Sequence, residues 1–352
     1  MKQFYSRLLV ATTIITSLNQ QTAFAGNEDR VGQAGATELL INPFARSSGW
    51  AGANTAGMRG VESLFFNVAG SAFTKKTEFV FANSSWLGGA GINMNAFGFT
   101  QAVGADKTGT LGLSLMSMNF GDIMRTTVNA PEGGLGFFTP SFVNIGLSYA
   151  KEFSNSIYGG IVFRTVSQSI ADINALGVCF DAGVQYVTGT NENLRFGIAI
   201  RNIGPKMRFN GDGLSFKGQV PETGAVLTVQ QRSEAFELPS LLNIGVSYAF
   251  DLAEQHQLIA AGNFMSNSFS KDNFQLGLEY SFKKMFMVRT GYNYEPGITN
   301  MVDRTTALTG PTAGFTFEAP VSKGGSTFAL DYSYRAANPF SGVHTIGARI
   351  NL

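Results

Sequence analysis

From about residue 77 to the last residue, the sequence alternates between large apolar residues and small or polar ones. In the segment 175–188, for example, apolar side chains occupy every second position, and glycine, cysteine, aspartate and glutamine occupy most positions between them. A period of two indicates a β-strand, because successive side chains of a strand point to opposite faces. Most segments span about ten residues, which is enough for a tilted strand to cross a bilayer. The pattern therefore predicts strands with one apolar and one polar face.

Composition decides what such strands form, since a soluble sandwich also alternates. Only 14% of the residues are charged, far below the roughly 25% of soluble proteins, and the 352 residues include 42 glycines. No run of 18 or more apolar residues occurs, which excludes a membrane helix. A transmembrane barrel needs an apolar outer face and a polar lumen, and it must close because an open edge leaves backbone groups unpaired in lipid. We therefore predict an all-β, antiparallel transmembrane β-barrel.

The number of alternating segments is even, as single-chain bacterial barrels require. The fourteen segments are 77–83, 91–102, 109–119, 142–152, 157–166, 175–188, 194–203, 241–252, 256–265, 273–283, 285–294, 312–319, 326–335 and 343–352. Connections also alternate, as expected when periplasmic turns are short and outer loops long. The longer connections are 121–141, 204–240 and 295–309, and the short ones include 152–156, 189–192, 253–255 and 283–284.

Two segments precede the barrel, which we place at residues 77–352. Residues 1–25 resemble a secretory signal peptide, with Lys2 and Arg7 before an apolar run and Ala23-Phe24-Ala25 at the cleavage site. Residues 26–76 alternate little. A fourteen-stranded barrel is wide enough to enclose a lumen, so we expect residues 26–76 to plug it as a hatch; the alternative is a periplasmic arm. Export and the barrel together predict the bacterial outer membrane, with membrane lipid as a partner.

Two stretches of the N-terminal segment carry a family resemblance. Residues 45–56 (ARSSGWAGANTA) and 61–70 (VESLFFNVAG) resemble the "AR-x-x-GMGGA…A…FxNPAG" region of the PorV/PorQ family. That family is similar to the FadL-type fatty-acid transporters, which are fourteen-stranded barrels with an N-terminal hatch. The residues that match the motif are Ala45, Arg46, Gly49, Asn67, Ala69 and Gly70.

The resemblance implies a non-enzymatic outer-membrane component of the type IX secretion system of Bacteroidetes. Its partners would be secreted cargo proteins and the translocon or attachment components, with the barrel presenting cargo at the cell surface. The candidate cargo-binding loop is 204–240, with the turn Asn210, Gly211, Asp212 and Gly213; shielding of the pore mouth is the simpler alternative. The rival function is a FadL-like transporter of a hydrophobic small molecule.

Alternation places several charged side chains on the lumen face of the strands. Charges within the membrane are costly and normally face a cavity or one another. We consider two roles for them, a salt-bridge lattice that holds the hatch and a pathway for a solute. The candidate lumen charges are Asp181, Arg195, Arg201, Glu279, Arg289, Asp331, Arg335 and Arg349.

Other function classes lack the residues they need. The net charge is +1 and no basic run occurs, so the sequence does not predict nucleic-acid binding. Two histidines without an aligned nucleophile, and a single cysteine, predict neither catalysis nor a metal site. We therefore expect no enzymatic activity and no cofactor.

Overall fold

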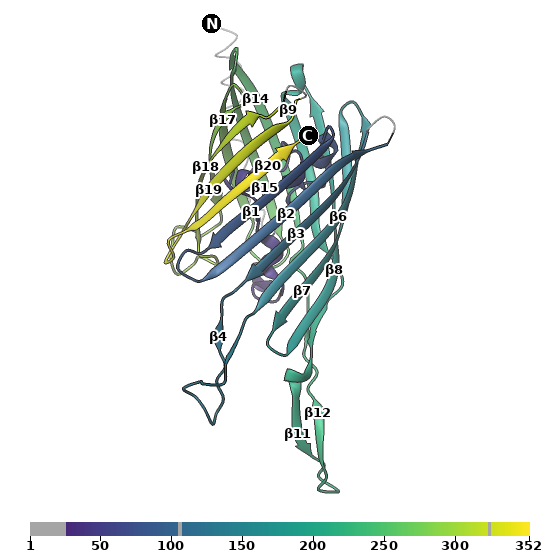
Figure 1. The fold of residues 1–352 in the computed structure, drawn as a ribbon, viewed down its shortest axis with the longest axis vertical. Coiled ribbons are helices and arrows are strands. Elements are labelled where there is room, and N and C mark those ends of the chain that lie inside the picture. The colour runs from purple at the N-terminus through teal and green to yellow at the C-terminus, as the bar shows by residue number, and fades with distance from the viewer. Residues whose placement is uncertain (1–25, 105–107, 323–324) are drawn as a thin grey trace.

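The computed structural model describes residues 26–104, 108–322 and 325–352, and the predicted signal peptide lies outside the described residues. Within these ranges the chain forms a 16-stranded sheet, in which the short strands β10 and β13 attach to β8. The other fourteen strands (16 − 2) form a closed antiparallel barrel, because β8 also pairs with β9 and β1 pairs with β20 (Figure 1). The predicted fold class and strand number are confirmed.

The barrel strands coincide with the predicted segments to within a few residues at nearly every end. They are β1 (Thr77–Trp86), β2 (Ile92–Val103), β3 (Gly109–Asn119), β6 (Ser141–Ser154), β7 (Ile157–Ile170), β8 (Ile173–Thr188), β9 (Leu194–Ile203), β14 (Leu241–Ala253), β15 (His256–Asn267), β16 (Asn273–Phe282), β17 (Phe286–Tyr294), β18 (Leu308–Pro320), β19 (Thr327–Ala337) and β20 (Val343–Asn351). One connection differs from the predicted alternation. β7 and β8 extend beyond the neighbouring strands, so only residues 171–172 join them at the end where long loops are expected.

The strand faces agree with the predicted pattern. In β8, Asp181 and Gln185 are buried, whereas Phe180 and Val184 are about half exposed. Apolar side chains are exposed along the other barrel strands as well. This arrangement is the reverse of a soluble core and suits a sheet whose outer face meets lipid.

Long connections lie at one end of the barrel, which we call the outer end. The connection after β3 contains β4 (Ile123–Met124) paired with β5 (Phe137–Phe138). The connection after β9 contains β10 (Met207–Asn210), η6 (Asp212–Leu214), β11 (Ser215–Gln219), β12 (Val226–Gln230) and β13 (Ala235–Phe236). β11 and β12 form a hairpin that projects well beyond the barrel, beside β4 (Figure 1).

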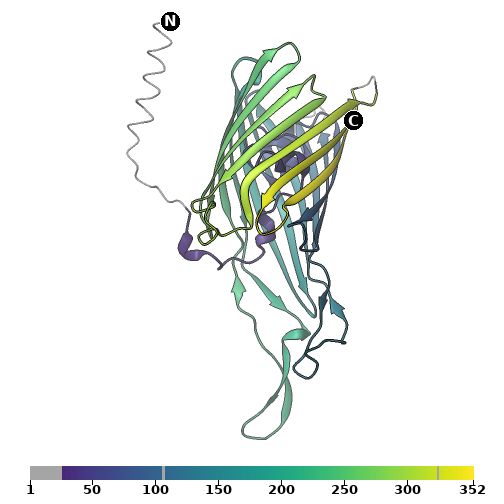
Figure 2. The ribbon, with the colours of Figure 1, turned by 90° about the vertical axis from the view of Figure 1, so that its left-hand side faces the viewer.

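The N-terminal segment, residues 26–76, runs through the lumen from the outer end to the opposite, inner end (Figure 2). At the outer end Gly35 N donates to the Glu237 carbonyl (3.0 Å), and near the inner end Thr74 hydrogen-bonds Thr100 of β2 (3.0 Å). The segment forms short helical turns: η1 (Glu28–Arg30), η2 (Thr37–Leu40), α2 (Ala45–Ser48), η3 (Val61–Phe65) and η4 (Val68–Phe73). No helix among the described residues is long and apolar enough to span a membrane.

Candidate ligand passage and its surroundings

One side of the lumen, the packed wall (β1–β3 and β6–β8), is filled by large apolar side chains. Phe44 and Phe65 of the N-terminal segment meet edge to face, with ring centroids 5.4 Å apart. Met116 of β3 and Phe142 of β6 are fully buried in the same cluster. Interdigitated side chains of this kind leave little space, because protein interiors pack as densely as organic crystals.

The opposite side, the glycine wall (β9 and β14–β18), brings several glycines directly against the N-terminal segment. A Cβ atom on Gly277 would lie 2.7 Å from the Trp50 ring, and one on Gly291 would lie 2.6 Å from the Trp50 carbonyl carbon. Gly197 is equally close to the Thr55 carbonyl oxygen, at 2.6 Å. Glycine is required at these positions because the backbone of residues 50–56 lies directly against the sheet.

Two cavities lie between the N-terminal segment and the glycine wall. The outer one, the vestibule, has a volume of about 620 Å³ and is lined by residues of the N-terminal segment, the outer loops and the ends of β1, β3 and β15–β19. The deeper one, the inner cavity, has a volume of about 150 Å³. Five residues line both, so the two are adjacent: Leu40, Met265, Asn293, Leu308 and Arg335.

Amide side chains form a ladder along the glycine-wall side of this passage. Asn263 donates to Asn243 (3.2 Å) and to Gln275 (2.7 Å), and nearer the outer end Asn267 donates to Asn273 (2.8 Å). Leu40, Met265 and Leu308 supply apolar surface. The passage therefore combines apolar surface with hydrogen-bonding groups, as small-molecule sites do.

A groove lies on the lipid side of the glycine wall, with a volume of about 770 Å³. It is lined by small and apolar residues of β14–β18, among them Ala260, Gly277 and Gly291. Pro311 of β18 lines both this groove and the inner cavity. Larger side chains, such as Tyr248 and Leu276, also line the groove.

All eight candidate lumen charges lie on the lumen side of the barrel. Asp181 is shared by Arg164 (2.7 Å) and Arg201 (4.0 Å), and Glu279 pairs with Arg289 (2.7 Å). Arg349 lies 3.7 Å from Asp331 and 3.1 Å from Glu318. Arg195 donates to the Glu192 carbonyl (3.3 Å), and Arg335 donates to the Asn42 carbonyl (3.3 Å).

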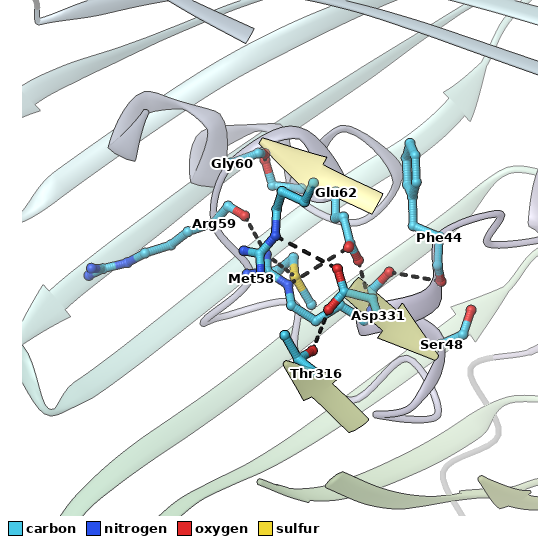
Figure 3. A network of polar contacts seen from close by, with 12 residues as sticks. Phe44, Ser48, Met58, Arg59, Gly60, Glu62, Thr316 and Asp331 are labelled. Carbon is cyan, nitrogen blue, oxygen red and sulfur yellow. Dashed lines mark hydrogen bonds and ion pairs between the residues drawn. The ribbon is translucent and has the colours of Figure 1, made fainter. Parts of the chain in front are cut away.

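Several of these charges hold the N-terminal segment in place. Arg164 donates to the Leu64 carbonyl, and Arg201 donates to the Leu39 carbonyl at 3.3 Å. A second network lies deeper, where Thr316 donates to Asp331 and Glu62 accepts from Ser47 N at 2.7 Å (Figure 3). These contacts favour the lattice role over a solute pathway for most of the charges.

The resemblance motif residues are all positioned inside the lumen. Arg46 donates to the Arg59 carbonyl (2.8 Å), and the Gly49 carbonyl accepts from Thr312 of β18 (3.0 Å). Asn67 caps η4 by accepting from Ala69 N and donates to the Val184 carbonyl of β8 (2.9 Å).

Close contacts explain why two further motif positions are small. Ala45 is 1% exposed and faces Gly347 of β20, and a Cβ atom on Gly70 would meet the Met58 carbonyl at 2.0 Å. The motif therefore shapes the fold of the segment.

The candidate loop residues lie at the base of the β11–β12 hairpin. Asn210 is the last residue of β10 and pairs with Asn174 of β8. Gly213 N donates to the Asp172 carbonyl (3.3 Å). A Cβ atom on Gly211 would lie 2.3 Å from the same carbonyl oxygen, and the φ of +144° also favours glycine. The turn with Asp212 thus joins the hairpin to the barrel and is separate from the passage.

Two carboxylates near the outer end have shifted pKa values. Burial raises the pKa of Glu38, despite hydrogen bonds that include one from Gln168 (3.0 Å). Hydrogen bonds from Arg30 and Lys206 instead hold the pKa of Glu237 below its usual range. Arg30 and Glu237 lie 3.1 Å apart and join the N-terminal segment to the loop before β14.

Sequence reasoning missed Arg164 and the amide ladder. Arg164 is buried next to the exposed Phe163 in β7, so the same facing argument could have found it. The ladder residues Asn243, Asn263 and Gln275 also lie on the lumen face of their strands. Only the strand register shows that they are adjacent. No group of three or more His, Cys, Asp or Glu residues able to hold a metal occurs among the described residues.

A closed fourteen-stranded antiparallel barrel with its N-terminal segment inside the lumen defines the class: the chain has the FadL-like outer-membrane barrel fold. No protein family model matches the sequence, and no curated protein matches it.

Solved structures do match. They include the toluene transporter TodX of Pseudomonas putida, at 12% identity and a TM-score of 0.53, covering 84% of this chain and 94% of that one. The CymD monoaromatic hydrocarbon channel matches at 12% identity and a TM-score of 0.52, covering 88% and 97%. A Pseudomonas aeruginosa FadL homologue matches at 10% identity and a TM-score of 0.48, covering 88% and 97%. At such low identity the likeness to TodX and CymD shows a shared fold, and these two neighbours are a transporter and a channel.

Proposed function

We propose that this protein is an outer-membrane transporter of small hydrophobic molecules, which enter at the vestibule and leave toward the membrane through the glycine wall. The observation that carries the proposal is that the vestibule and the inner cavity are adjacent and share five lining residues, and that an apolar groove on the lipid side shares Pro311 with the inner cavity. The structural neighbours TodX, a toluene transporter, and CymD, a monoaromatic hydrocarbon channel, support the same class of molecule. No catalytic step is needed.

Filling the groove tests this route. Ala260 lines the groove on β15, and Ala260→Trp places a large ring there without touching the lumen. Ala182 of β8 also faces lipid but lies outside the groove, so Ala182→Trp is a matched control. In proteoliposomes we expect toluene uptake to fall with Ala260→Trp and to remain at the wild-type rate with Ala182→Trp. Equal rates for both variants, or no uptake by the wild type, would contradict the proposal.

A second candidate function is the protein interaction that the PorV/PorQ resemblance implies, in which the barrel binds secreted cargo or translocon components of a type IX pathway. The projecting β11–β12 hairpin supports it, because Phe216, Leu227 and Val229 share one exposed apolar face. Exposed apolar patches often mark protein contact sites. A mild-detergent pull-down from the native membrane, comparing the wild type with a Phe216→Ser and Leu227→Ser variant, tests this candidate. Recovery of the same partners by both would remove the hairpin from the interaction.

A further inference from the structure

The described part of the N-terminal segment begins at Gly26, at the outer end of the barrel (Figure 2). Gly26 N donates to Asp272 Oδ2 at 2.7 Å, although the two residues are 246 positions apart in the sequence. Asp272 immediately precedes β16 and is 8% exposed. The backbone nitrogen of residue 26 is therefore fixed against a buried carboxylate of the barrel.

The same pocket has no room for a side chain on residue 26. A Cβ atom on Gly26 would lie 2.8 Å from Asp272 Oδ1, 2.8 Å from the Ser270 carbonyl oxygen and 2.9 Å from Asp272 N. Contacts under 3.0 Å would force the neighbouring atoms to shift. Glycine is thus the residue that brings its nitrogen to this carboxylate without moving the loop between β15 and β16.

The residues after Gly26 are tied to the same part of the barrel. Asn27 N donates to the Asn267 carbonyl at 3.4 Å. The Arg30 guanidinium lies over the Phe269 ring, 4.1 Å from its centroid. The position of Gly26 N therefore depends on several contacts with this loop and not on a single hydrogen bond.

The sequence points to the same nitrogen independently. Ala23-Phe24-Ala25 is the predicted small-x-small cleavage site, so a signal peptidase would hydrolyse the Ala25–Gly26 bond. Water adds across this bond, the new carboxylate leaves on Ala25, and the Gly26 nitrogen becomes an α-amine. An α-amine is mostly protonated at neutral pH. Cleavage would thus replace a neutral amide, which has one N–H, by an ammonium group, which has three.

We propose that the chain is processed between Ala25 and Gly26 and that Asp272 binds the new N-terminal ammonium. The 2.7 Å hydrogen bond between Gly26 N and Asp272 would then become charge-assisted, and such bonds are roughly twice as strong as neutral ones. The ion pair can form only in the processed chain. Processing therefore fixes the first residue of the N-terminal segment at the vestibule, which the adjacent Ser270 lines. This inference goes beyond the transport proposal and does not depend on it.

The reactivity of the N-terminal amine tests the proposal in the full barrel, purified from the outer membrane in a neutral detergent. Mass spectrometry first identifies the N-terminal residue, which should be Gly26. Acetylation by an N-hydroxysuccinimide ester at pH 7 then reports how freely the amine reacts, because only an accessible, unprotonated amine is acetylated. Asp272→Asn keeps the size of the side chain and removes its charge. We expect its N-terminal amine to react roughly tenfold or more faster than that of the wild type.

Two further variants separate the ion pair from an effect on folding. Asp172→Asn removes an exposed carboxylate of the outer end, 3.1 Å from Arg125, and should leave the amine as protected as in the wild type. One alanine inserted after Ala25 keeps Asp272 and moves the amine by one residue, about 3.8 Å. This amine should react as fast as that of Asp272→Asn, even if Asp272→Asn folds poorly.

Three results would overturn the proposal. The first is an N-terminal residue other than Gly26 in the wild type. The second is an N-terminal amine that reacts equally fast in the wild type and in the insertion variant, since the amine would then not be held by Asp272. The third is an equal gain in reactivity in Asp172→Asn, which would show that the protection does not come from this carboxylate.

Discussion

The two walls of the lumen hold the same N-terminal segment by different means. The packed wall surrounds Phe44 and Phe65 with large side chains and joins Arg164 to Asp181 at 2.7 Å. The glycine wall offers backbone and small residues, so that Trp50 lies directly against Gly277 and Gly291. Both cavities and the lipid-side groove occur at the glycine wall.

The difference indicates which wall can change shape. Removing a large side chain from a dense core leaves a cavity that relaxes only in part. A backbone held against glycines has fewer contacts to lose when it moves away. We therefore interpret the packed wall as the anchor of the segment and the glycine wall as the side on which a ligand can pass.

The largest expected effect is on the anchor. Arg164→Met would leave the buried Asp181 with Arg201, 4.0 Å away, as its only ion-pair partner among the described residues, and removing one partner of a buried pair costs about 3–5 kcal/mol. Urea unfolding in phospholipid vesicles measures this cost. Arg125→Met is a matched control, because Arg125 pairs with Asp172 at 3.1 Å on the exposed outer loops, where a pair contributes about 0–1 kcal/mol. Similar costs for both variants would contradict the anchoring role.

The next effect concerns neighbouring positions on β8. Val184 faces lipid, and an arginine there should cost up to about 2–4 kcal/mol, depending on its depth in the bilayer. Alternation alone suggests that Gln185→Arg would cost much less, because residue 185 faces the lumen. The structure changes this expectation, since Gln185 is 0% exposed and donates to the Thr55 (3.3 Å) and Met58 (3.2 Å) carbonyls. We expect both variants to lower the free energy of unfolding by a comparable amount in the same experiment. A near-neutral Gln185→Arg would mean that the N-terminal segment can move away from the packed wall.

Gln185 shows how far sequence reasoning reaches. Its face follows from a period of two, which also predicts the fourteen strands, because lipid and lumen impose opposite chemistry on alternate residues. The occupant of the lumen does not follow from that period, since residues 26–76 form short turns without a repeating pattern. Arg335 illustrates the same limit at the candidate site. Alternation places it in the lumen, but its lack of an ion-pair partner among the described residues depends on contacts between distant strands.

A smaller effect should separate two glycines of adjacent strands. A Cβ atom on Gly277 would lie 2.7 Å from the Trp50 ring, whereas one on Gly262 would meet only Leu276, at 3.6 Å. Gly277→Val should therefore destabilise the barrel by about 1–3 kcal/mol, the usual cost of overpacking. Gly262→Val should change the free energy of unfolding little. Equal stability of the two variants would show that Trp50 moves freely and that the glycine wall is looser than its contacts indicate.

The smallest effect is a pH dependence at the outer end. Burial raises the pKa of Glu38 above its ordinary value of 4.5, so the folded state favours the protonated form. The stability from this group is complete below its unfolded pKa and is lost as the pH rises through the higher folded pKa. Glu38→Gln should then match the wild type in thermal midpoint below about pH 4 and exceed it at neutral pH.

Glu237 should respond with the opposite sign, because hydrogen bonds from Arg30 and Lys206 lower its pKa. Its contribution is present above its unfolded pKa and is lost as the pH falls through the lower folded value. Glu237→Gln should therefore lower the thermal midpoint at neutral pH and have no effect in strong acid. The two variants together distinguish a buried carboxyl in the vestibule from an exposed tether at its rim, and parallel pH profiles would show that Glu38 is more hydrated than its burial implies.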